Sequence, residues 1–412
     1  MWTRTGTWSL RGLSAWPWRP RVPFHPYPRG ATRNPQLSAA RTVIYGSIHA
    51  LDSARWDALV GSHAVTRTHA YLAAIEASGI NDCKYFYPVL YDARNEIIAH
   101  ACVYTITTDF VQILPRLLRG VGRAVQTLWP KFLQVKLTEC ASPLVVGRSI
   151  SIRDDVEPYA VLGELARAIG EIAHSERSSL TVIRDFLGTE RERYDGLLEA
   201  GYHRVSNKPL ARIKVRWNTY DEYLSQMRAR YRKDIKRRLQ RANTDGQQIE
   251  ILESFAANAE LWARQARVMY ENTKGIKREI LSAAYYAHMD HRLGEQSKLL
   301  VATRDGRQIA HGMMLLDAEN TTATYFGRDA GPPCHAWFHL INEVIRFAIE
   351  RKSAYINLGL GSYEAKALVG ADVEPLYVYS KSTYTIVNWL MKLIPNRMEY
   401  PVKESKRIFH EV

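Results

Sequence analysis

The sequence predicts an α/β protein with two similar halves in tandem, each a mixed, largely antiparallel sheet flanked by helices. Apolar residues at helical spacing alternate along the chain with short apolar stretches typical of strands. In addition, LYDARNEIIAH at 90–100 parallels VATRDGRQIAH at 301–311, and each copy precedes one long helix and one apolar strand. We therefore expect one domain over residues 44–216 and a second over 217–382.

Turn signals and apolar spacing define the elements of the first half. Leu162, Leu165, Ile169 and Ile172 fall on one helix face, and the turn residues DARN at 92–95 join two strands. In chain order we expect a helix over 69–77, strands over 84–91 and 97–107, an amphipathic stretch over 111–128 interrupted near Pro115, an apolar segment over 133–146, a helix over 158–175, a strand over 179–186, a helix over 190–200 and a strand over 210–215.

The second half repeats this plan. Tyr220, Leu224, Met227, Tyr231 and Ile235 form one apolar stripe, which predicts a single helix over 220–242. The further elements expected are a strand over 248–252, helices over 261–270 and 283–293, strands over 298–303, 308–316 and 321–327, a helix over 336–351 and a strand over 354–360. The amphipathic tail, residues 383–412 with its apolar part at 383–394, is too short to span a bilayer. We expect it to pack on the core.

The net charge of +14 comes from two local segments. Residues 1–43 hold seven arginines and no acid, and residues 227–242 (MRARYRKDIKRRLQRA) hold eight cations against Asp234, so each contributes +7. The first segment mixes Arg, Trp and Pro without any period. It is expected to be a disordered leader, in preference to an organellar targeting peptide.

Composition excludes several classes of protein. No stretch of eighteen uncharged apolar residues is present, which excludes an ordinary membrane span. The four cysteines are far apart without zinc-ligand spacing, so they indicate reduced thiols in a cytoplasmic compartment and no metal site. His335 and His339 are spaced as a metal pair, but no third ligand accompanies them.

Two segments carry a family resemblance. GSYEAKALVG at 361–370 follows an apolar strand, and LWPKFLQVKLTECASPLVVGR at 128–148 lies in the first half. Together with the element order over 44–381, they resemble the GNAT acyltransferase fold, and the tandem arrangement resembles the Fem-type aminoacyltransferases and bacterial Fem-like proteins. In that family a Lys and a Gly follow the turn, matching Lys366 and Gly370. One subgroup has His where this chain has Ala365.

The resemblance implies an N-acyltransferase with its chemistry in the second domain, while the first helps to bind the acceptor. Amide formation requires an unprotonated amine and stabilisation of the oxyanion. The turn after strand 354–360 lies where open α/β sheets bind ligands. We therefore assign Glu364 as candidate base, Lys366 as partner of the oxyanion or a phosphate, and Tyr363 as proton donor. An exposed ion pair on a turn is the alternative for Glu364 and Lys366.

The acyl donor stays open between acyl-CoA and aminoacyl-tRNA, and no covalently bound cofactor is expected. Relatives that use coenzyme A bind its pyrophosphate with backbone N–H groups at the start of the long helix. The corresponding segment here keeps Arg328 and Gly331, but Pro332 and Pro333 remove two donors. His335, Asn342 and Asn357 are further candidates for contact with the donor or substrate.

The basic segment 227–242 suggests an anionic partner. Arg232, Lys236 and Arg237 lie among the cations opposite the apolar stripe, where tRNA, a phosphorylated acceptor or an anionic membrane surface would bind. A solvated helix face is the alternative. These cations also support a rival function, that of a catalytically silent protein which binds tRNA or an anionic glycan. For either function a cytoplasmic location, in part at the membrane periphery, is expected.

Overall fold

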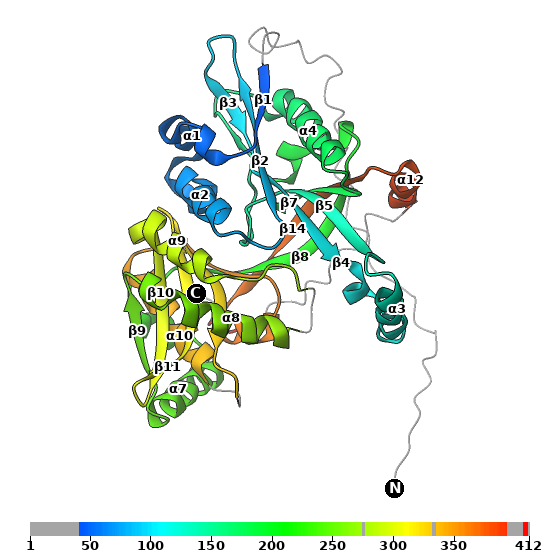
Figure 1. Cartoon of the computed structure of the whole chain (residues 1–412). Helices are drawn as coiled ribbons and strands as arrows, with labels where there is room; N and C mark the ends of the chain where they lie inside the picture. Colours follow the sequence, from blue (N-terminus) through cyan, green and yellow to red (C-terminus); the bar gives the residue numbers. More distant parts are fainter. Residues whose placement is uncertain (1–40, 274–276, 332–334, 394–406, 411–412) are drawn as a thin grey trace, which may run out of the picture.

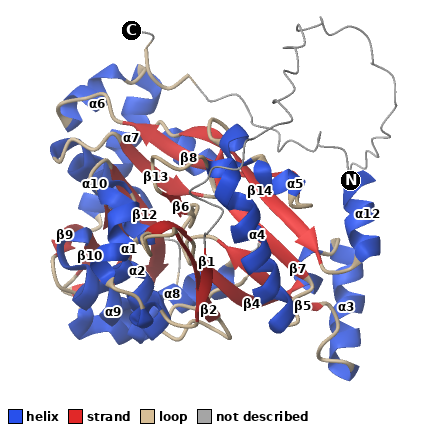
Figure 2. Ribbon diagram, turned by 90° about the horizontal axis from the view of Figure 1, so that it is seen from above, coloured by secondary structure: helices blue, strands red, loops and turns tan. Residues whose placement is uncertain are grey.

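One mixed sheet runs through the whole described part of the chain (Figure 1). A computed structural model describes residues 41–273, 277–331, 335–393 and 407–410. The strand order is β6-β3-β2-β4-β5-β7-β14-β8-β13-β12-β11-β10-β9, and β1 pairs with β2 beside this path. Helices cover the sheet (Figure 2), which confirms the predicted α/β class.

The elements have the following bounds. The strands are β1 (Arg41–Tyr45), β2 (Lys84–Tyr91), β3 (Ile97–His100), β4 (Val103–Asp109), β5 (Gln134–Cys140), β6 (Ser151–Ile152), β7 (Leu180–Leu187), β8 (His203–Lys214), β9 (Gln248–Leu252), β10 (Ser297–Arg304), β11 (Arg307–Leu316), β12 (Asn320–Arg328), β13 (Tyr355–Gly359) and β14 (Asp372–Ser382). The α-helices are α1 (Ser53–Val60), α2 (His69–Ala77), α3 (Arg116–Leu128), α4 (Pro158–Ser175), α5 (Gly196–Glu199), α6 (Tyr220–Gln226), α7 (Ala229–Thr244), α8 (Ala259–Asn272), α9 (Ala283–Leu293), α10 (Ala336–Glu350), α11 (Tyr363–Leu368) and α12 (Thr385–Leu393).

Several elements have the bounds that the sequence predicts, namely α2, α4, α9, β2 and β9. Their local signals are strong. The hydroxyls of Thr68 and Ser282 accept hydrogen bonds from N–H groups in the first turns of α2 and α9, and Pro158 occupies the first turn of α4. Side-chain caps of this kind satisfy donors that a helix start would otherwise leave unpaired.

The two halves exchange strands at the centre of the sheet. The last strand of the chain, β14, lies between β7 and β8, and it pairs antiparallel with both. Strand β8 in turn pairs with β13 of the second half. The predicted boundary at 216/217 therefore separates segments that share one sheet, and it stays a prediction. Strand β1 begins at Arg41, so the last three residues of the expected leader, 41–43, belong to this strand. Residues 1–40 lie outside the described part.

The predicted helix 220–242 is interrupted at Met227. Met227 is extended and forms an antiparallel bridge with Phe409 from the end of the chain. The Arg228 N–H donates to Ile408 O at 2.9 Å, and the His410 N–H donates to Gln226 O at 3.0 Å. Ile408 is buried, and the Phe409 ring lies against Gly370. The prediction of a single helix was wrong because a segment about 180 residues away in sequence pairs with the backbone at Met227.

Two further predictions differ from the structure for local reasons. The predicted strand 97–107 divides into β3 and β4. Pro88 of β2 lies opposite the break between these two strands, and it has no N–H to donate to them. The turn after β13 contains the short helix α11. Its N-terminal flanking residue, Ser362, has φ of 50°, in the left-handed region.

The apolar part of the tail, expected over 383–394, does not pack on the core over its described residues, whereas Ile408 near the end of the tail is buried. Helix α12 follows β14 and leaves Tyr384, Ile386, Val387 and Trp389 exposed. The expectation of core packing is therefore wrong for this helix. Among the described residues, no helix combines the length and apolar character that crossing a membrane requires.

The docked tail yields a stability prediction. Ile408→Ala removes a buried side chain from the core of the second half, and we expect the free energy of unfolding to fall by about 2–4 kcal/mol. Urea unfolding followed by circular dichroism measures this change. Ile386→Ala on α12, where the side chain is 74% exposed, is the matched control and should change stability by less than about 0.5 kcal/mol. Equal effects of the two substitutions would contradict the docking of the tail.

Candidate functional site

The candidate site lies where the parallel strands β12 and β13 diverge. Only Asn320–Thr322 of β12 pair with Tyr355–Asn357 of β13, although β12 continues to Arg328. Beyond the pairing, each strand has unpaired edge groups, and the gap between them opens toward helices on both sides. Two cavities occupy this region and share the side chains of Thr324, Tyr325 and Leu358.

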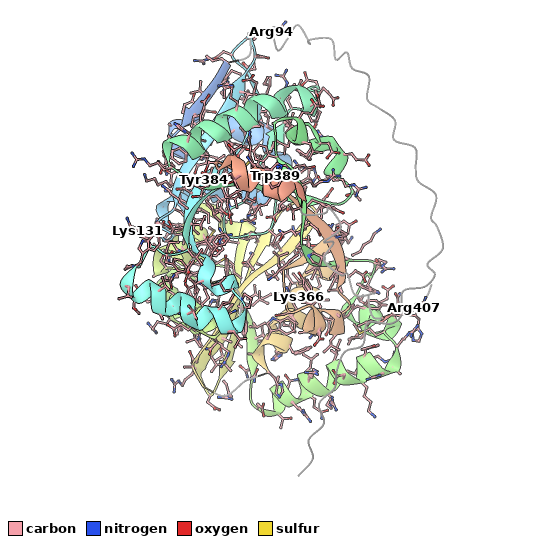
Figure 3. All side chains as sticks on the ribbon, turned by 90° about the vertical axis from the view of Figure 1, so that its right-hand side faces the viewer. Arg94, Lys131, Lys366, Tyr384, Trp389 and Arg407 are labelled. Carbon is pink, nitrogen blue, oxygen red and sulfur yellow. The ribbon has the colours of Figure 1, made fainter. Side chains whose placement is uncertain are left out.

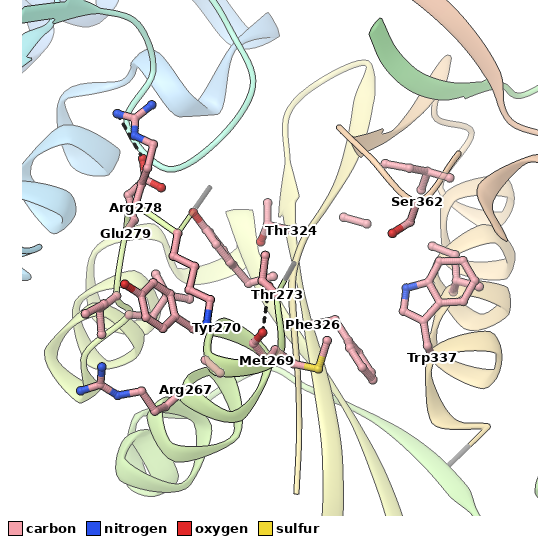
Figure 4. Close-up of a pocket in the computed structure, with 18 of the residues that line it drawn as sticks. Arg267, Met269, Tyr270, Thr273, Arg278, Glu279, Thr324, Phe326, Trp337 and Ser362 are labelled. Atoms are coloured by element: carbon pink, nitrogen blue, oxygen red, sulfur yellow. Dashed lines mark hydrogen bonds and ion pairs between the residues drawn. The ribbon is translucent and has the colours of Figure 1, made fainter. Parts of the chain in front are cut away.

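The first of these, which we call the splay cavity, has a volume of about 610 Å³. Figure 4 shows α8 and the segment after it on one side, the strands in the middle, and Trp337 and Ser362 on the other side. The charged residues that line it are four cations and one acid: Arg267, Lys277, Arg278, Lys366 and Glu279. Its walls thus carry a net positive charge, which favours an anionic ligand.

Lys366 is the buried cation of the splay cavity. Its side chain is in the last turn of α11 and is only 8% exposed. The Nζ atom donates a hydrogen bond to Leu360 O at 3.0 Å. Desolvation by burial lowers the pKa of the Lys366 ammonium to about 8. The group is therefore mostly protonated at neutral pH, and it is placed to donate hydrogen bonds to an anion in the cavity.

The other two residues of the predicted catalytic set are placed differently. Glu364 lies in the first turn of α11 with an exposed side chain, and it does not line the splay cavity. The Tyr363 hydroxyl donates to Pro209 O at 2.8 Å, which links α11 to β8. Of the three residues, only Lys366 is brought into the cavity.

The second cavity, the junction cavity, has a volume of about 590 Å³ and lies between the two halves. Residues of the first half, among them Glu139, Arg184 and Asn207, line it together with Arg278 and Glu279. The Tyr325 hydroxyl crosses the same boundary and donates to Leu144 O at 2.7 Å. Both halves therefore contribute to one continuous site.

A buried charge network lies against the junction cavity. Glu139 Oε2 accepts hydrogen bonds from Arg184 Nε at 3.0 Å and Tyr104 Oη at 2.8 Å, and Oε1 lies 2.9 Å from Arg278 Nη2. Burial favours the neutral form of Glu139, but the charges of Arg184 and Arg278 outweigh it and lower its pKa to about 2. Arg184 also pairs with Asp185 at 2.5 Å.

Three of the predicted donor-binding residues lie together, outside the splay and junction cavities. Arg328, Gly331 and His335 line a hollow of about 420 Å³ together with Arg304 and Arg307. The Arg328 guanidinium donates hydrogen bonds to the carbonyls of Asp329 and Gly331, both at 3.1 Å. Its side chain is therefore bound to the backbone of the segment that follows it. Pro332 and Pro333 lie outside the described residues.

The two predicted asparagines have different environments. Asn342 is buried on α10, where its Oδ1 accepts from Tyr220 Oη at 2.7 Å and its Nδ2 donates to Phe338 O at 2.7 Å. The bond to Tyr220 joins α10 to α6, and the bond to Phe338 lies within α10. Asn342 does not line the splay or junction cavity. Asn357 lines the junction cavity and donates to Thr322 Oγ1 at 3.2 Å across the start of the splay.

The basic helix α7 packs against α10 on the outside of the second half. Lys236 and Arg237 are exposed, and Arg237 pairs with Asp234. Arg232 is turned inward and donates to the carbonyls of Ser225 at 2.9 Å and Met227 at 3.0 Å. It therefore stabilises the break between α6 and α7, while the other two face solvent.

Sequence reasoning missed the residues that join the halves at the site, chiefly Glu139, Arg184, Arg278, Glu279 and Tyr325. Arg278 and Glu279 lie in an irregular segment between two predicted helices, and adjacent opposite charges are common on surfaces. A weak signal existed for Glu139 and Arg184. Both are charged residues inside apolar strands, where a charge needs a partner.

Among the described residues, no group of three metal-ligating side chains is found.

Comparison with known proteins gives one family and a common fold. A model of the FemAB-like family, described as peptidoglycan biosynthesis and recognition, matches residues 47–367. Proteins of Mycobacterium tuberculosis named putative 8-amino-7-oxononanoate synthase 2 are 25% identical over 321 residues, which are 76% of this chain and 42% of that protein. The chain thus spans less than half the length of these curated relatives.

Two solved structures share the fold. The crystal structure of FemX has a TM-score of 0.54 at 12% identity, over 82% of this chain and 98% of FemX. A tandem GNAT protein from the clavulanic acid biosynthesis pathway has a TM-score of 0.50 at 9% identity, over 83% of this chain and 98% of that chain. At such identities they show the fold, which is that of two GNAT units in tandem.

The charge network yields a second prediction. Glu139→Gln leaves Arg184 and Arg278 without their shared carboxylate, and we expect a loss of about 3 kcal/mol of stability at pH 7. Because folding lowers the pKa of Glu139 to about 2, its contribution is present above about pH 4.5 and is lost as the pH falls toward 2. Urea unfolding at pH 7, 4 and 2.5 measures it. The difference between the two proteins should shrink at low pH, and a constant difference would contradict the assignment.

Proposed function

The chain belongs to the FemAB-like family, and from this premise we propose that it is an N-acyltransferase that joins an activated acyl or aminoacyl group to an amine. The observation that carries the proposal is the splay cavity, where diverging strands meet a buried, mostly protonated lysine. A cavity of this size accommodates an acyl group and an amine side by side.

The proposed reaction uses Lys366 as an electrostatic group. The amine nitrogen attacks the acyl carbonyl carbon, and the tetrahedral oxyanion accepts a hydrogen bond from the Lys366 ammonium. The bond from the acyl carbon to the donor's ester oxygen or thioester sulfur then breaks as the amide forms, and the leaving atom takes up the proton that a carboxylate has removed from the amine. A cation in a low-dielectric cavity stabilises such an oxyanion far more than a solvated one does. Its desolvation is a cost to the folded protein, which supports a role for this ammonium in the reaction.

The amine must lose a proton, and two carboxylates are candidates to accept it. Glu364 is the residue proposed from the sequence, next to the cavity on α11. Glu279 lines both cavities and lies 3.7 Å from the Arg278 guanidinium. Because a general base has to reach the amine, we favour Glu279 over Glu364. Tyr363 is the proposed proton donor, but its hydroxyl donates to a backbone carbonyl.

The proposed acceptor is an amine on an anionic molecule. The cations of the splay cavity outnumber its acid four to one. The curated relatives are named for 8-amino-7-oxononanoate, a compound with an amine, a ketone and a carboxylate, and more than half of their length lies outside the match. An amino acid-like acceptor of this class fits a cationic cavity, and so does an anionic amine of peptidoglycan, which the family is described as making or recognising.

The proposed donor is an aminoacyl-tRNA, with acyl-CoA as the alternative. Pro332 and Pro333, which precede α10 in the sequence, have no N–H groups, and Arg328 is engaged by its own loop, so these residues favour a donor other than one held by its pyrophosphate. The exposed cations of α7 suit a phosphate backbone. A catalytically silent protein that binds tRNA or an anionic glycan through α7 is the rival function.

A third prediction tests the enzyme against this rival. Lys366→Met should lower the transfer rate at least a hundredfold because the oxyanion loses its cation. The same change should raise stability at pH 7 by about 1–3 kcal/mol, because the free energy that lowers the Lys366 pKa from 10.5 to about 8 is no longer required. Mass spectrometry of the amide product and urea unfolding measure the two effects.

The carboxylates supply the matched controls for this experiment. Glu279→Gln should slow transfer at least tenfold, whereas Glu364→Gln should slow it less than threefold. The opposite order would return the role of base to Glu364. Unchanged transfer in Lys366→Met, with the fold intact, would refute the catalytic role of the splay cavity.

A fourth prediction concerns the donor. Lys233→Gln, Lys236→Gln and Arg237→Gln together should weaken tRNA binding at least tenfold and reduce the slope of log affinity against log salt by about 2–3. Filter binding at 50–200 mM salt measures both. The control removes three exposed cations elsewhere, Arg94, Arg193 and Arg292. If this control has the same effect, or if only acyl-CoA binds, the tRNA proposal fails.

A further inference from the structure

Helix α3 exposes an apolar surface that nothing in the described chain covers. Leu117, Val121 and Leu128 fall within a narrow arc of the helix and are 90%, 62% and 91% exposed. Trp129, directly after the helix, is also exposed. The helix is held to the protein by another side, where Gln126 Nε2 donates to Asp109 Oδ1 and Phe132 O, each at 3.0 Å.

Helix α12 repeats this feature at a distant point of the sequence. Ile386 and Trp389 are 74% and 59% exposed, and Tyr384 and Val387 are exposed beside them. Asn388 links the helix to the end of β14: its Oδ1 accepts from the Ser382 N–H and its Nδ2 donates to Ser382 O, both at 2.8 Å. These four apolar side chains therefore remain in solvent although they would gain free energy by leaving it.

The two helices lie on the same side of the molecule. Figure 1 places both at the right-hand edge, and Figure 3, which views that side directly, shows both facing the reader. Trp389 on α12 and Lys131 just after α3 are labelled in that view. Two separate apolar helices on one side define a broad surface, which we call the α3–α12 surface.

The α3 part of this surface is basic. Residues 114–133 contain three arginines and one lysine and no acid. Arg123 and Lys131 are exposed, and Arg119 reaches back to donate to Leu114 O at 3.2 Å. An apolar arc with cations opposite it, in a helix too short to span a bilayer, is the pattern of helices that lie in the membrane interface.

The charge also favours one occupant over another. In a symmetric dimer the surface would face a copy of itself, so the cations of α3 would meet the same cations across the contact. An anionic lipid surface meets the cations with opposite charge and takes up Trp, Leu and Ile side chains at the level of its headgroups. Two apolar helices that stand apart on one side also suit a broad, deformable surface.

We propose that the α3–α12 surface binds anionic membranes, with the apolar residues of both helices inserted at the headgroup boundary. The inference is independent of the proposed transfer reaction. It places the protein at a membrane without a spanning segment in the described chain, held by apolar insertion and by the charge of α3.

Site-specific fluorescence on the full chain tests the proposal. Leu128→Cys and Ile386→Cys each carry an environment-sensitive fluorophore, and Ala284→Cys on α9, at the opposite edge in Figure 1, is the control position. The unmodified chain, labelled in the same way, corrects for the four native cysteines. With vesicles of phosphatidylglycerol and phosphatidylcholine, emission should shift to the blue at 128 and 386 and stay constant at 284.

Vesicle sedimentation supplies a second measurement. Leu117→Ser, Leu128→Ser, Ile386→Ser and Trp389→Ser together should weaken binding to these vesicles at least tenfold, without lowering the melting temperature. Pure phosphatidylcholine should bind the unmodified chain at least tenfold more weakly than the mixture. Sedimentation without a blue shift at 128 and 386 would overturn the proposal, because the chain would then attach elsewhere. A blue shift that grows with protein concentration without vesicles would identify a second copy as the occupant.

Discussion

The exchange of β8 and β14 is the constraint on which the rest of the structure depends. Each of these strands lies in the sheet beside a strand of the other half, so the hydrogen-bonded ladder continues from one half to the next. Backbone groups in a sheet interior require partners, and the partners of each half lie partly in the other. The halves are therefore held in one arrangement, which fixes the position of the junction cavity between them.

The charge network follows from this arrangement. Arg278 comes from the second half and Glu139 from the first. They form an ion pair at the buried boundary between the halves, which the shared sheet holds together. Buried ion pairs of this kind contribute little net stability compared with apolar packing, but they are costly to break. We interpret the network as a determinant of the relative placement of the halves. The same boundary then supplies residues of both halves to one site.

The described surface has three regions of different chemical character. The splay cavity is cationic, with a lysine whose pKa is lowered by burial to about 8. Helix α7 presents solvated cations on the outside of the second half, and the α3–α12 surface combines apolar side chains with cations on another side. A transferase that takes a large anionic donor and works at a membrane would use all three, each for a different contact.

The sequence by itself determined the local elements and one residue of the site. Caps and apolar spacing act within a few residues, so α2, α4, α9, β2 and β9 were predictable. The position of Lys366 after an apolar strand predicted a place at the strand end, and Lys366 lines the splay cavity. Only the tertiary structure decided which strands pair, where the helix breaks at Met227, and that Arg278 and Glu139 meet. These outcomes depend on contacts between residues more than a hundred positions apart. A periodic apolar stripe predicts a helix, but it does not say what covers the stripe. For that reason α12 was expected in the core and is found exposed.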